Sequence, residues 1–196
     1  MQHTKQSLAA HAPYPGFQLH IDIMAVPDES KHLIRPQRYQ ITAIDIATQI
    51  RFLGLCRSLT ATSAVRFLRK ALSFFAKLGI CVQSVRTPNH AMFLKTDLRR
   101  GKKVCHLHPF TRFCRKRGII HVLNRHDLRW HNCFVEQSRQ IDEEEFYRFW
   151  NPGRLSDKAL AAKLQIWQYR YNCFRLHPCC NYEPPLKRYL SLNKAD

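Results

Sequence analysis

Two acidic residues lie in apolar sequence surroundings, where a charged side chain is unusual. Asp22 stands between Ile21 and Ile23 in the run FQLHIDIMAV, and Glu136 lies in NCFVEQSRQ. An aspartate flanked in this way is costly unless it faces a cleft or gains a partner. Carboxylate oxygens are preferred ligands of Mg²⁺, and a divalent ion held by them can bridge a phosphate and activate an attacking oxygen. The two acids are far apart in the sequence, so only the fold can bring them together.

Hydrophobic periodicity predicts the strands that would position the first acid. Residues 17–26, 39–48 and 50–58 are rich in partly alternating apolar residues, which predicts an antiparallel meander of three strands. From 60 to 79 the apolar residues recur every three or four positions. This change of period predicts a helix that Thr60 or Thr62 can cap and that Gly79 ends.

The second half of the chain predicts two more strands and three helices. Residues 80–86 and 119–123 form short apolar runs typical of buried strands. A short helix is predicted over 109–118, and longer helices over 131–150 and 156–174, the last beginning at Ser156. The order of elements predicts an α/β fold, with a five-stranded mixed sheet flanked by helices, and it resembles the ribonuclease H-like fold.

Several motifs follow one another in an order typical of a known family. HIDI resembles a first-carboxylate strand, YQITAIDIATQIRF the hairpin after it, and TPNHAMF the pattern T-D-N-G-x-E-F. HNCFVEQSRQIDEEEFY resembles the helix with the third carboxylate, and YNCFRLHPCCNYEPP a C-terminal motif. Over residues 14–186 the chain thus resembles the catalytic core of the DDE transposase and retroviral-integrase superfamily, in particular bacterial insertion-sequence transposases with an integrase-type core.

The resemblance assigns site residues and also reveals a departure. It implies that Asp22 and Glu136 hold the first and third catalytic and metal-binding positions. The second position, which is an aspartate in the family, is Pro88 here. Further departures from the pattern are His90, Met92, Cys133 and Gln137.

The loss of the second carboxylate has a chemical consequence. Proline supplies no side-chain ligand, so we expect Asp22 and Glu136 to hold at most a single, weakly bound Mg²⁺ or Mn²⁺. Without a pair of ions, charge stabilisation for phosphoryl transfer is reduced, and strand transfer should be absent or very weak. Asn89, His90 and Asp97 are candidate substitute ligands, although imidazole and amide groups suit Mg²⁺ less well than carboxylate.

The chain is strongly basic. It has 32 Lys and Arg against 14 Asp and Glu, a net charge of +18 and a pI near 10.0. Such an excess indicates a polyanionic partner, and we expect DNA. Trp130, Phe134 and Tyr147 could stack on bases or pack in helices. The candidate DNA-binding residues, predicted to flank the cleft, are Arg99, Arg100, Lys102, Lys103, Arg115, Lys116, Arg117, Arg125 and Arg129.

Other polar residues have simpler interpretations. Asp45 precedes a turn and is predicted to brace the hairpin, and the run from Asp142 to Glu145 is predicted to be a solvated helix face. Cysteine and histidine gather in two places without the paired C-x-x-C spacing of a structural zinc site, so loop and core roles are favoured over zinc. These residues are Cys105, His106, His108 and Cys114 in one segment, and Cys173, His177, Cys179 and Cys180 in the other.

The organisation and function follow as hypotheses. We expect a flexible arm over 1–15, one core domain over 16–186, a tail over 187–196, no membrane segment and a cytoplasmic location. The first hypothesis is a DNA-binding integrase-type core with impaired catalysis, and such cores often form homodimers. One alternative is an active metal-dependent transposase or nuclease that uses Asp22, Glu136 and a substitute ligand. Another is a protein-interaction module on an integrase fold.

Overall fold

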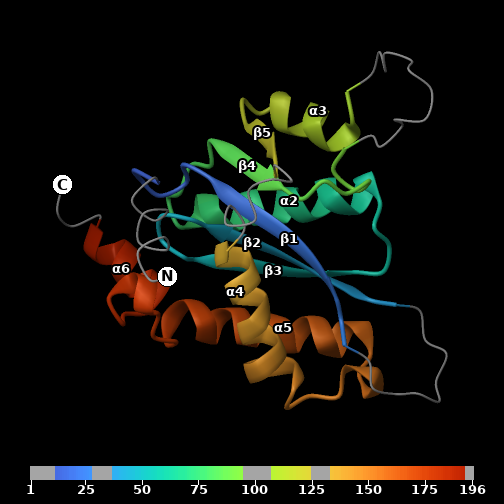
Figure 1. Cartoon of the computed structure of the whole chain (residues 1–196), viewed down its shortest axis with the longest axis vertical. Coiled ribbons are helices and arrows are strands. Elements are labelled where there is room, and N and C mark those ends of the chain that lie inside the picture. Colours follow the sequence, from blue (N-terminus) through green and yellow to red (C-terminus); the bar gives the residue numbers. More distant parts are fainter. Residues whose placement is uncertain (1–11, 28–36, 95–106, 125–132, 193–196) are drawn as a thin grey trace.

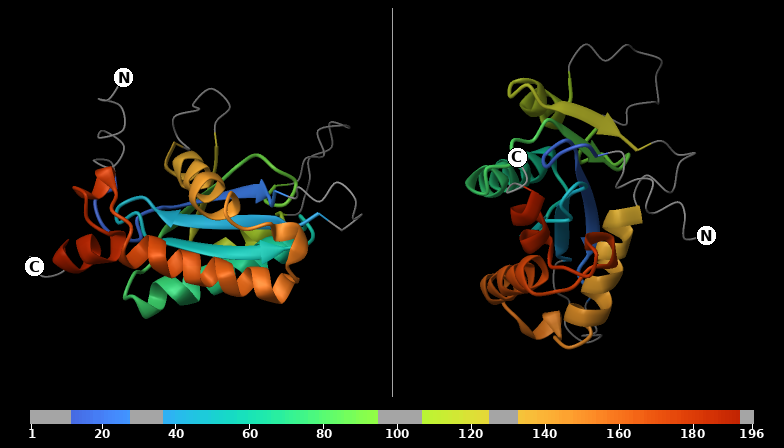
Figure 2. Two further views of the ribbon diagram at one scale, coloured as in Figure 1. Left: turned by 90° about the horizontal axis from the view of Figure 1, so that it is seen from below. Right: turned by 90° about the vertical axis from the view of Figure 1, so that its left-hand side faces the viewer.

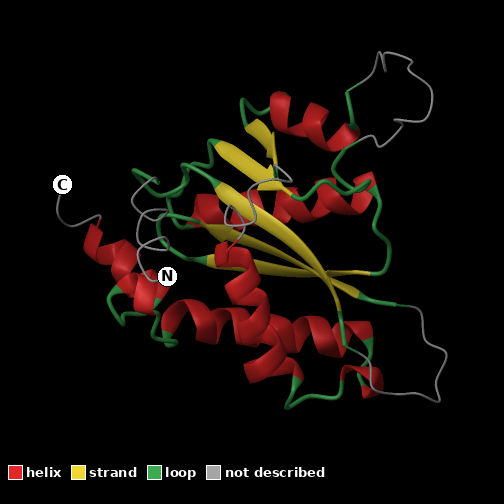
Figure 3. Ribbon diagram, in the orientation of Figure 1, coloured by secondary structure: helices red, strands yellow, loops and turns green. Residues whose placement is uncertain are grey.

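A five-stranded mixed sheet forms the centre of the molecule (Figure 3). The computed structural model describes residues 12–27, 37–94, 107–124 and 133–192. The strand order is β3-β2-β1-β4-β5; β1 pairs antiparallel with β2 and β2 with β3, whereas β4 is parallel to both β1 and β5. The predicted fold class is therefore confirmed. The strands are β1 (Leu19–Ala25), β2 (Tyr39–Asp45), β3 (Arg51–Cys56), β4 (Ser84–Thr87) and β5 (Ile120–Leu123).

Helices cover both faces of this sheet (Figures 1 and 2). Helices α2 (Ala61–Lys77) and α3 (Pro109–Arg115) lie on one face, and α4 (Cys133–Asp142) crosses the other. Helix α5 (Asp157–Cys173) packs along the edge strand β3, and α6 (Pro185–Leu192) follows it. Within the described residues, no helix has the length and apolar character needed to cross a membrane.

The ends of the predicted helices are set by local hydrogen bonds. Thr60 caps α2, because its hydroxyl accepts the Ser63 N–H at 3.2 Å, and Gly79 follows the helix with a φ of 79°. Ser156 caps α5 in the same way, accepting the Ala159 N–H at 3.2 Å. These bonds satisfy amide groups that the first turn of a helix leaves unpaired. Both predicted caps are confirmed.

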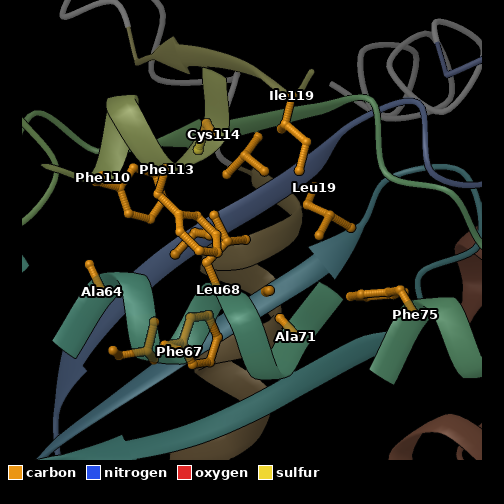
Figure 4. Packing of buried hydrophobic residues seen from close by; sticks show 14 of the residues in the cluster. Leu19, Ala64, Phe67, Leu68, Ala71, Phe75, Phe110, Phe113, Cys114 and Ile119 are labelled. Carbon is orange, nitrogen blue, oxygen red and sulfur yellow. The ribbon is translucent and has the colours of Figure 1, made fainter. Parts of the chain in front are cut away.

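The main hydrophobic core lies between the sheet and the α2–α3 layer (Figure 4). Leu19 and Ile21 project from β1 into this core, where they meet Leu68 and Phe75 of α2 and Phe110 of α3. A second cluster fills the space between the opposite face and α5, where Met24 and other sheet residues pack. The two cores fix which side of β1 each residue faces, because side chains alternate along a strand.

Side chains of α5 complete the outer edge of the sheet. Asn172 accepts the Arg51 N–H at 3.0 Å and donates to the Arg51 carbonyl at 2.9 Å. Gln168 accepts the Leu53 N–H at 2.7 Å. These groups take the place of a neighbouring strand, so this part of the β3 edge has partners for its backbone.

The structure differs from the predicted elements in three places. The helix predicted over 131–150 ends as an α-helix at Asp142 and continues as one π-helical turn, η2 (Glu143–Tyr147). The fourth strand begins at Ser84 rather than at residue 80. Helix α6 was not predicted, and it is held by a hydrogen bond from the buried Tyr189 hydroxyl to the Leu78 carbonyl at 2.7 Å.

Candidate active site

Asp22 lies in the middle of β1, on the face that α4 crosses. Its neighbours Ile21 and Ile23 pack toward the α2 core, whereas Met24, two residues along, belongs to the core on the other side. Strand alternation therefore places Asp22 on the Met24 side, opposite Thr42 of β2. The side chain is half-buried, so water reaches only part of the carboxyl group.

Glu136 approaches Asp22 from the first turn of α4. Burial raises the pKa of Asp22, and the negative charge of Glu136 raises it further. The backbone N–H of Ile23 and the positive charge of Arg139 act in the opposite direction. The predicted first and third carboxylates are thus close enough for their charges to interact, as a shared site requires.

Pro88 lies level with Asp22, just past the end of the neighbouring strand β4. Strands β1 and β4 run parallel with Leu19 opposite Val85, and continuing this register places Pro88 level with Asp22. The proline follows directly after Thr87, the last residue of β4, and its carbonyl accepts the His90 N–H at 2.9 Å. The position that the resemblance assigns to a second carboxylate is therefore level with Asp22, and the side chain there is an apolar ring.

The nearby polar residues are engaged in holding the loop after β4. Asn89 donates its amide N–H to the Asn124 carbonyl at 2.9 Å, and Nδ1 of His90 accepts the Met92 N–H at 3.1 Å. Asp97, the third candidate substitute, lies outside the described residues. Within the described part of the chain, no group of three or more His, Cys, Asp and Glu is arranged to hold a metal. Two carboxylates supply too few oxygen ligands for a pair of divalent ions.

Arg139 is a member of the site that the sequence analysis missed. It lies one turn beyond Glu136 on α4, and its guanidinium also donates to Glu143 at 3.0 Å. Its positive charge lowers the pKa of Asp22 and so favours the ionised carboxylate there. The signal in the sequence was the spacing of three residues from Glu136, which places both side chains on one side of a helix.

Helix α4 is fixed in place by a buried ion pair at its C-terminal end. Arg51 of β3 and Asp142 of α4 are both fully buried and lie 2.8 Å apart. Asp142 also accepts hydrogen bonds of 2.6 Å from Trp167 and 2.6 Å from Gln40. The prediction that the run beginning at Asp142 is a solvated face is wrong for this residue, because it faces the sheet; Glu143, Glu144 and Glu145 are exposed as predicted.

Arg51 gains further contacts that suit a planar cation. Its NH1 donates to the Ser138 hydroxyl at 2.8 Å, and its guanidinium carbon lies 3.5 Å from the ring centroid of Tyr171. The salt bridge with Asp142 and the contact with the Tyr171 ring together stabilise the positive charge of the buried Arg51 guanidinium. The network thereby ties the helix that carries Glu136 to the sheet that carries Asp22.

Asp45 braces the hairpin between β2 and β3, as predicted. It is fully buried and accepts the Gly16 N–H at 2.9 Å, the Thr48 N–H at 3.0 Å and the Thr48 hydroxyl at 2.6 Å. Burial raises its pKa, and the hydrogen bonds from Thr48 and Gly16 oppose that effect. The residue is structural and lies at the other end of β2 from the Gln40–Asp142 contact.

The aromatic and zinc candidates are mostly core residues. Phe134 and Tyr147 are buried, and Tyr147 donates to Gln40 at 2.6 Å, so both have the helix-packing role; Trp130 lies outside the described residues. Cys114 is fully buried, and burial raises the pKa of its thiol to about 12. Burial, then the charges of Arg175 and Arg51, lower the pKa of His177 to about 4.

The basic candidates divide into two groups. Arg115, Lys116 and Arg117 are exposed at the C-terminal end of α3, just before β5 begins. Because β5 is parallel to β4, this is the end of the sheet away from Pro88. These three residues were predicted to lie beside the carboxylates, and the structure places them at the other end of the sheet. The remaining candidates, Arg99, Arg100, Lys102, Lys103, Arg125 and Arg129, lie outside the described residues.

One curated relative supports the resemblance at the level of sequence. A protein described as "Putative integrase ORF3", from Spiroplasma virus SpV1-C74, is 25% identical over 165 residues, which cover 84% of this chain and 45% of that protein. The chain thus spans less than half the length of this relative. No protein-family model matches the chain.

Solved structures establish the fold. The HTLV-2 integrase catalytic core domain in complex with magnesium superposes with a TM-score of 0.66 at 11% identity, covering 91% of this chain and 99% of that one. The catalytic core domain of BIV integrase gives a TM-score of 0.63 at 12% identity, covering 92% and 97%. The chain has the integrase-type core fold. This result confirms the predicted ribonuclease H-like fold, and the putative integrase that is 25% identical supports the predicted resemblance to the integrase and DDE transposase core superfamily.

An assembled integrase shows the same likeness to this integrase-type core. The simian T-cell lymphotropic virus intasome, in complex with PP2A regulatory subunit B56 gamma, contains a chain with a TM-score of 0.67 at 14% identity. The match covers 90% of this chain and 55% of that one. The match therefore extends over about half of that longer chain.

Proposed function

We propose that this integrase-type core binds DNA and is impaired in metal-dependent strand transfer. The observation that carries the proposal is the meeting of Asp22 and Glu136 across β1 and α4, with Pro88 at the position level with Asp22. Two carboxylates facing each other repel, and a divalent cation between them would relieve that repulsion.

The proposed metal is a single Mg²⁺ or Mn²⁺ held by Asp22 and Glu136. The HTLV-2 core is described in complex with magnesium, which supports a divalent ion for this fold. When bound, such an ion supplies charge for a phosphoryl group. This chain's own residues contribute the two oxygen ligands, and Arg139 offsets their charge. Because Pro88 supplies no third carboxylate, the site lacks the means to hold two ions.

DNA is the proposed substrate class because of charge and fold together. The net charge of +18 favours a polyanion, and an intasome chain has the same core fold. We test this by the fluorescence anisotropy of a labelled DNA duplex titrated with the protein at several salt concentrations. Binding that weakens steeply with salt supports the proposal. Absent or salt-insensitive binding would contradict it and favour a protein-interaction module.

Impaired catalysis needs a separate assay. Supercoiled plasmid is incubated with the protein in Mg²⁺ or Mn²⁺ and nicking is measured, with Asp22→Ala as the matched control. The proposal predicts that wild type and Asp22→Ala give equally low nicking. Robust nicking that requires both the metal and Asp22 would show an active nuclease or transposase instead.

We further propose that the core forms a homodimer through an exposed apolar side of α5. Ile166 and Tyr169 on this helix are 63% and 59% exposed, and Phe174, which packs edge-on against Tyr169, is 64% exposed. Exposed apolar groups of this size commonly mark an interface. The HTLV-2 core is described in dimeric and trimeric forms. Sedimentation velocity tests the proposal: Ile166→Glu should convert a dimer to a monomer, and a monomeric wild type would refute it.

A further inference from the structure

Helices α2 and α3 lie in a part of the chain almost free of acidic residues. Between Asp45 and Asp127 the sequence contains one acidic residue, Asp97, which belongs to neither helix. The acidic residues of the described chain lie instead on β1, at the end of β2, on α4 and η2, at the start of α5, and at Glu183. Among the described residues, α2 and α3 therefore carry positive side chains and no acidic ones.

A groove of about 440 Å³ runs between these two helices. Arg66 and Arg69 of α2 line one side, and Arg112 and Lys116 line the other. All four side chains are exposed, and none forms an ion pair with another described residue. Spacings of three and four residues keep the cations of each helix on one side, so they face each other across the groove.

The ring of Phe113, which lines the groove, contacts one arginine of the groove and a second arginine just after α3. Phe113 is 9% exposed, and the guanidinium carbon of Arg117 lies 3.8 Å from its ring centroid. The guanidinium carbon of Arg69 lies 5.7 Å from the same centroid. Such contacts restrict the arginine side chains before any ligand arrives, which lowers the entropy lost on binding.

The groove is on the opposite face of the sheet from the carboxylates. Helices α2 and α3 cover the core formed by Leu19 and Ile21, whereas Asp22 faces α4 (Figures 1 and 2). An anion in the groove therefore occupies a site separate from Asp22 and Glu136, with the sheet between them.

We propose that the groove between α2 and α3 holds the phosphate backbone of a DNA segment, as a second contact on the face away from the carboxylates. A row of uncompensated cations in an open groove suits a polymer with regularly spaced charges better than a single small anion. The inference rests on DNA as the partner and adds a surface that the carboxylate face does not require. An acidic protein segment is the competing occupant.

The test removes three charges from the groove of the full chain. Arg66→Gln, Arg112→Gln and Lys116→Gln are combined, and anisotropy of a labelled DNA duplex is measured from low to high salt. Each lost phosphate contact should lower the slope of log affinity against log salt by about 0.9, so the slope should fall by about 2 to 3. We expect affinity at moderate salt to fall by about tenfold or more. Circular dichroism and the urea midpoint verify that the variant is folded.

A matched control removes three exposed charges that line neither this groove nor the cavity beside Arg66, through Arg148→Gln, Arg154→Gln and Arg170→Gln. It changes the net charge equally, so a smaller loss in the control assigns the effect to the groove. Equal losses in both variants would overturn the groove while leaving DNA binding intact. No salt-sensitive binding by wild type would overturn the proposed function as well. Poly-glutamate binding that depends on the groove, with DNA binding that does not, would overturn the choice of occupant.

Protection of side chains provides a readout independent of folding. Phenylglyoxal modifies exposed arginines, and mass spectrometry compares the extent with and without a DNA duplex. Arg66, Arg69 and Arg112 should be protected by DNA more strongly than Arg148 and Arg170. Equal protection at all five positions would contradict a specific contact in the groove.

Discussion

Removal of Asp142 should destabilise the fold more than removal of Arg51, its partner in the buried ion pair. Both side chains are fully buried, with 2.8 Å between the ion-pair atoms. Asp142→Asn leaves the guanidinium buried without a counter-charge, and arginine does not lose its proton in proteins. Arg51→Met leaves a carboxyl group that keeps two hydrogen-bond donors, Trp167 and Gln40.

The expected magnitudes follow from this asymmetry. Breaking a buried pair by removing one partner costs about 3 to 5 kcal/mol, and we place Asp142→Asn near the top of that range. Arg51→Met should cost less, about 2 to 3 kcal/mol, because the remaining carboxyl group keeps two hydrogen-bond donors. Part of this cost is the lost contact of the guanidinium with the Tyr171 ring, 3.5 Å away. The double variant should be more stable than the sum of the single losses predicts, by roughly 1 to 3 kcal/mol.

Urea unfolding followed by circular dichroism measures these free energies. The midpoint should move while the slope with denaturant stays constant, which assigns the change to the folded state. The reasoning is refuted if Asp142→Asn costs under about 1 kcal/mol, which is the range of an exposed ion pair. It is also refuted if the two losses add to within about 0.5 kcal/mol, because contacting residues should couple.

Three further predictions concern stability. Burial and Glu136 raise the folded-state pKa of Asp22, so its ionised form opposes folding as pH rises; Asp22→Asn should raise the urea midpoint at pH 7, with the difference lost well below the unfolded-state pKa of 3.8. The pKa of His177 is lowered from 6.5 to about 4 in the folded protein. The free energy of unfolding should therefore rise by at most about 3 kcal/mol as the pH is raised from 4 to 6.5. His177→Asn should flatten this pH dependence, and an unchanged pH dependence would contradict the assignment to His177. Thr60→Ala should cost about 1 kcal/mol by thermal or urea unfolding through loss of the α2 cap, and no loss would refute that role.

The sheet and most helices were predictable because local patterns determine them. The strand around Asp22 has alternating faces, and the helix after Thr60 has both a cap and a glycine stop. Helix α6 escaped prediction because it is short and its position depends on the contact between Tyr189 and Leu78, residues distant in the chain. The π-helical turn after Asp142 likewise depends on tertiary contacts, which no local pattern encodes.

The candidate site was predicted from family resemblance more than from residue chemistry. The motif order implied that Asp22 and Glu136 lie near each other, and the charge of Glu136 does act on Asp22; their role as a metal site stays a prediction. The burial of Asp142 was missed because a run of acidic residues usually faces water, and its partner Arg51 lies on a distant strand. The placement of Arg115 and its neighbours was wrong for a geometric reason. They lie at the end of α3 that precedes the start of β5, whereas Asp22 is level with Pro88, which follows the C-terminal end of the parallel strand β4.

The central claim is that the site holds two carboxylates where two metal ions require three. Calorimetric titration with Mn²⁺ tests it directly on wild type, Pro88→Asp and Pro88→Asp with Asp22→Ala. We predict that wild type binds at most one ion weakly, and that Pro88→Asp binds two ions more tightly. The added Asp22→Ala should abolish this gain. Two ions bound tightly by wild type, and lost on Asp22→Ala, would contradict the account.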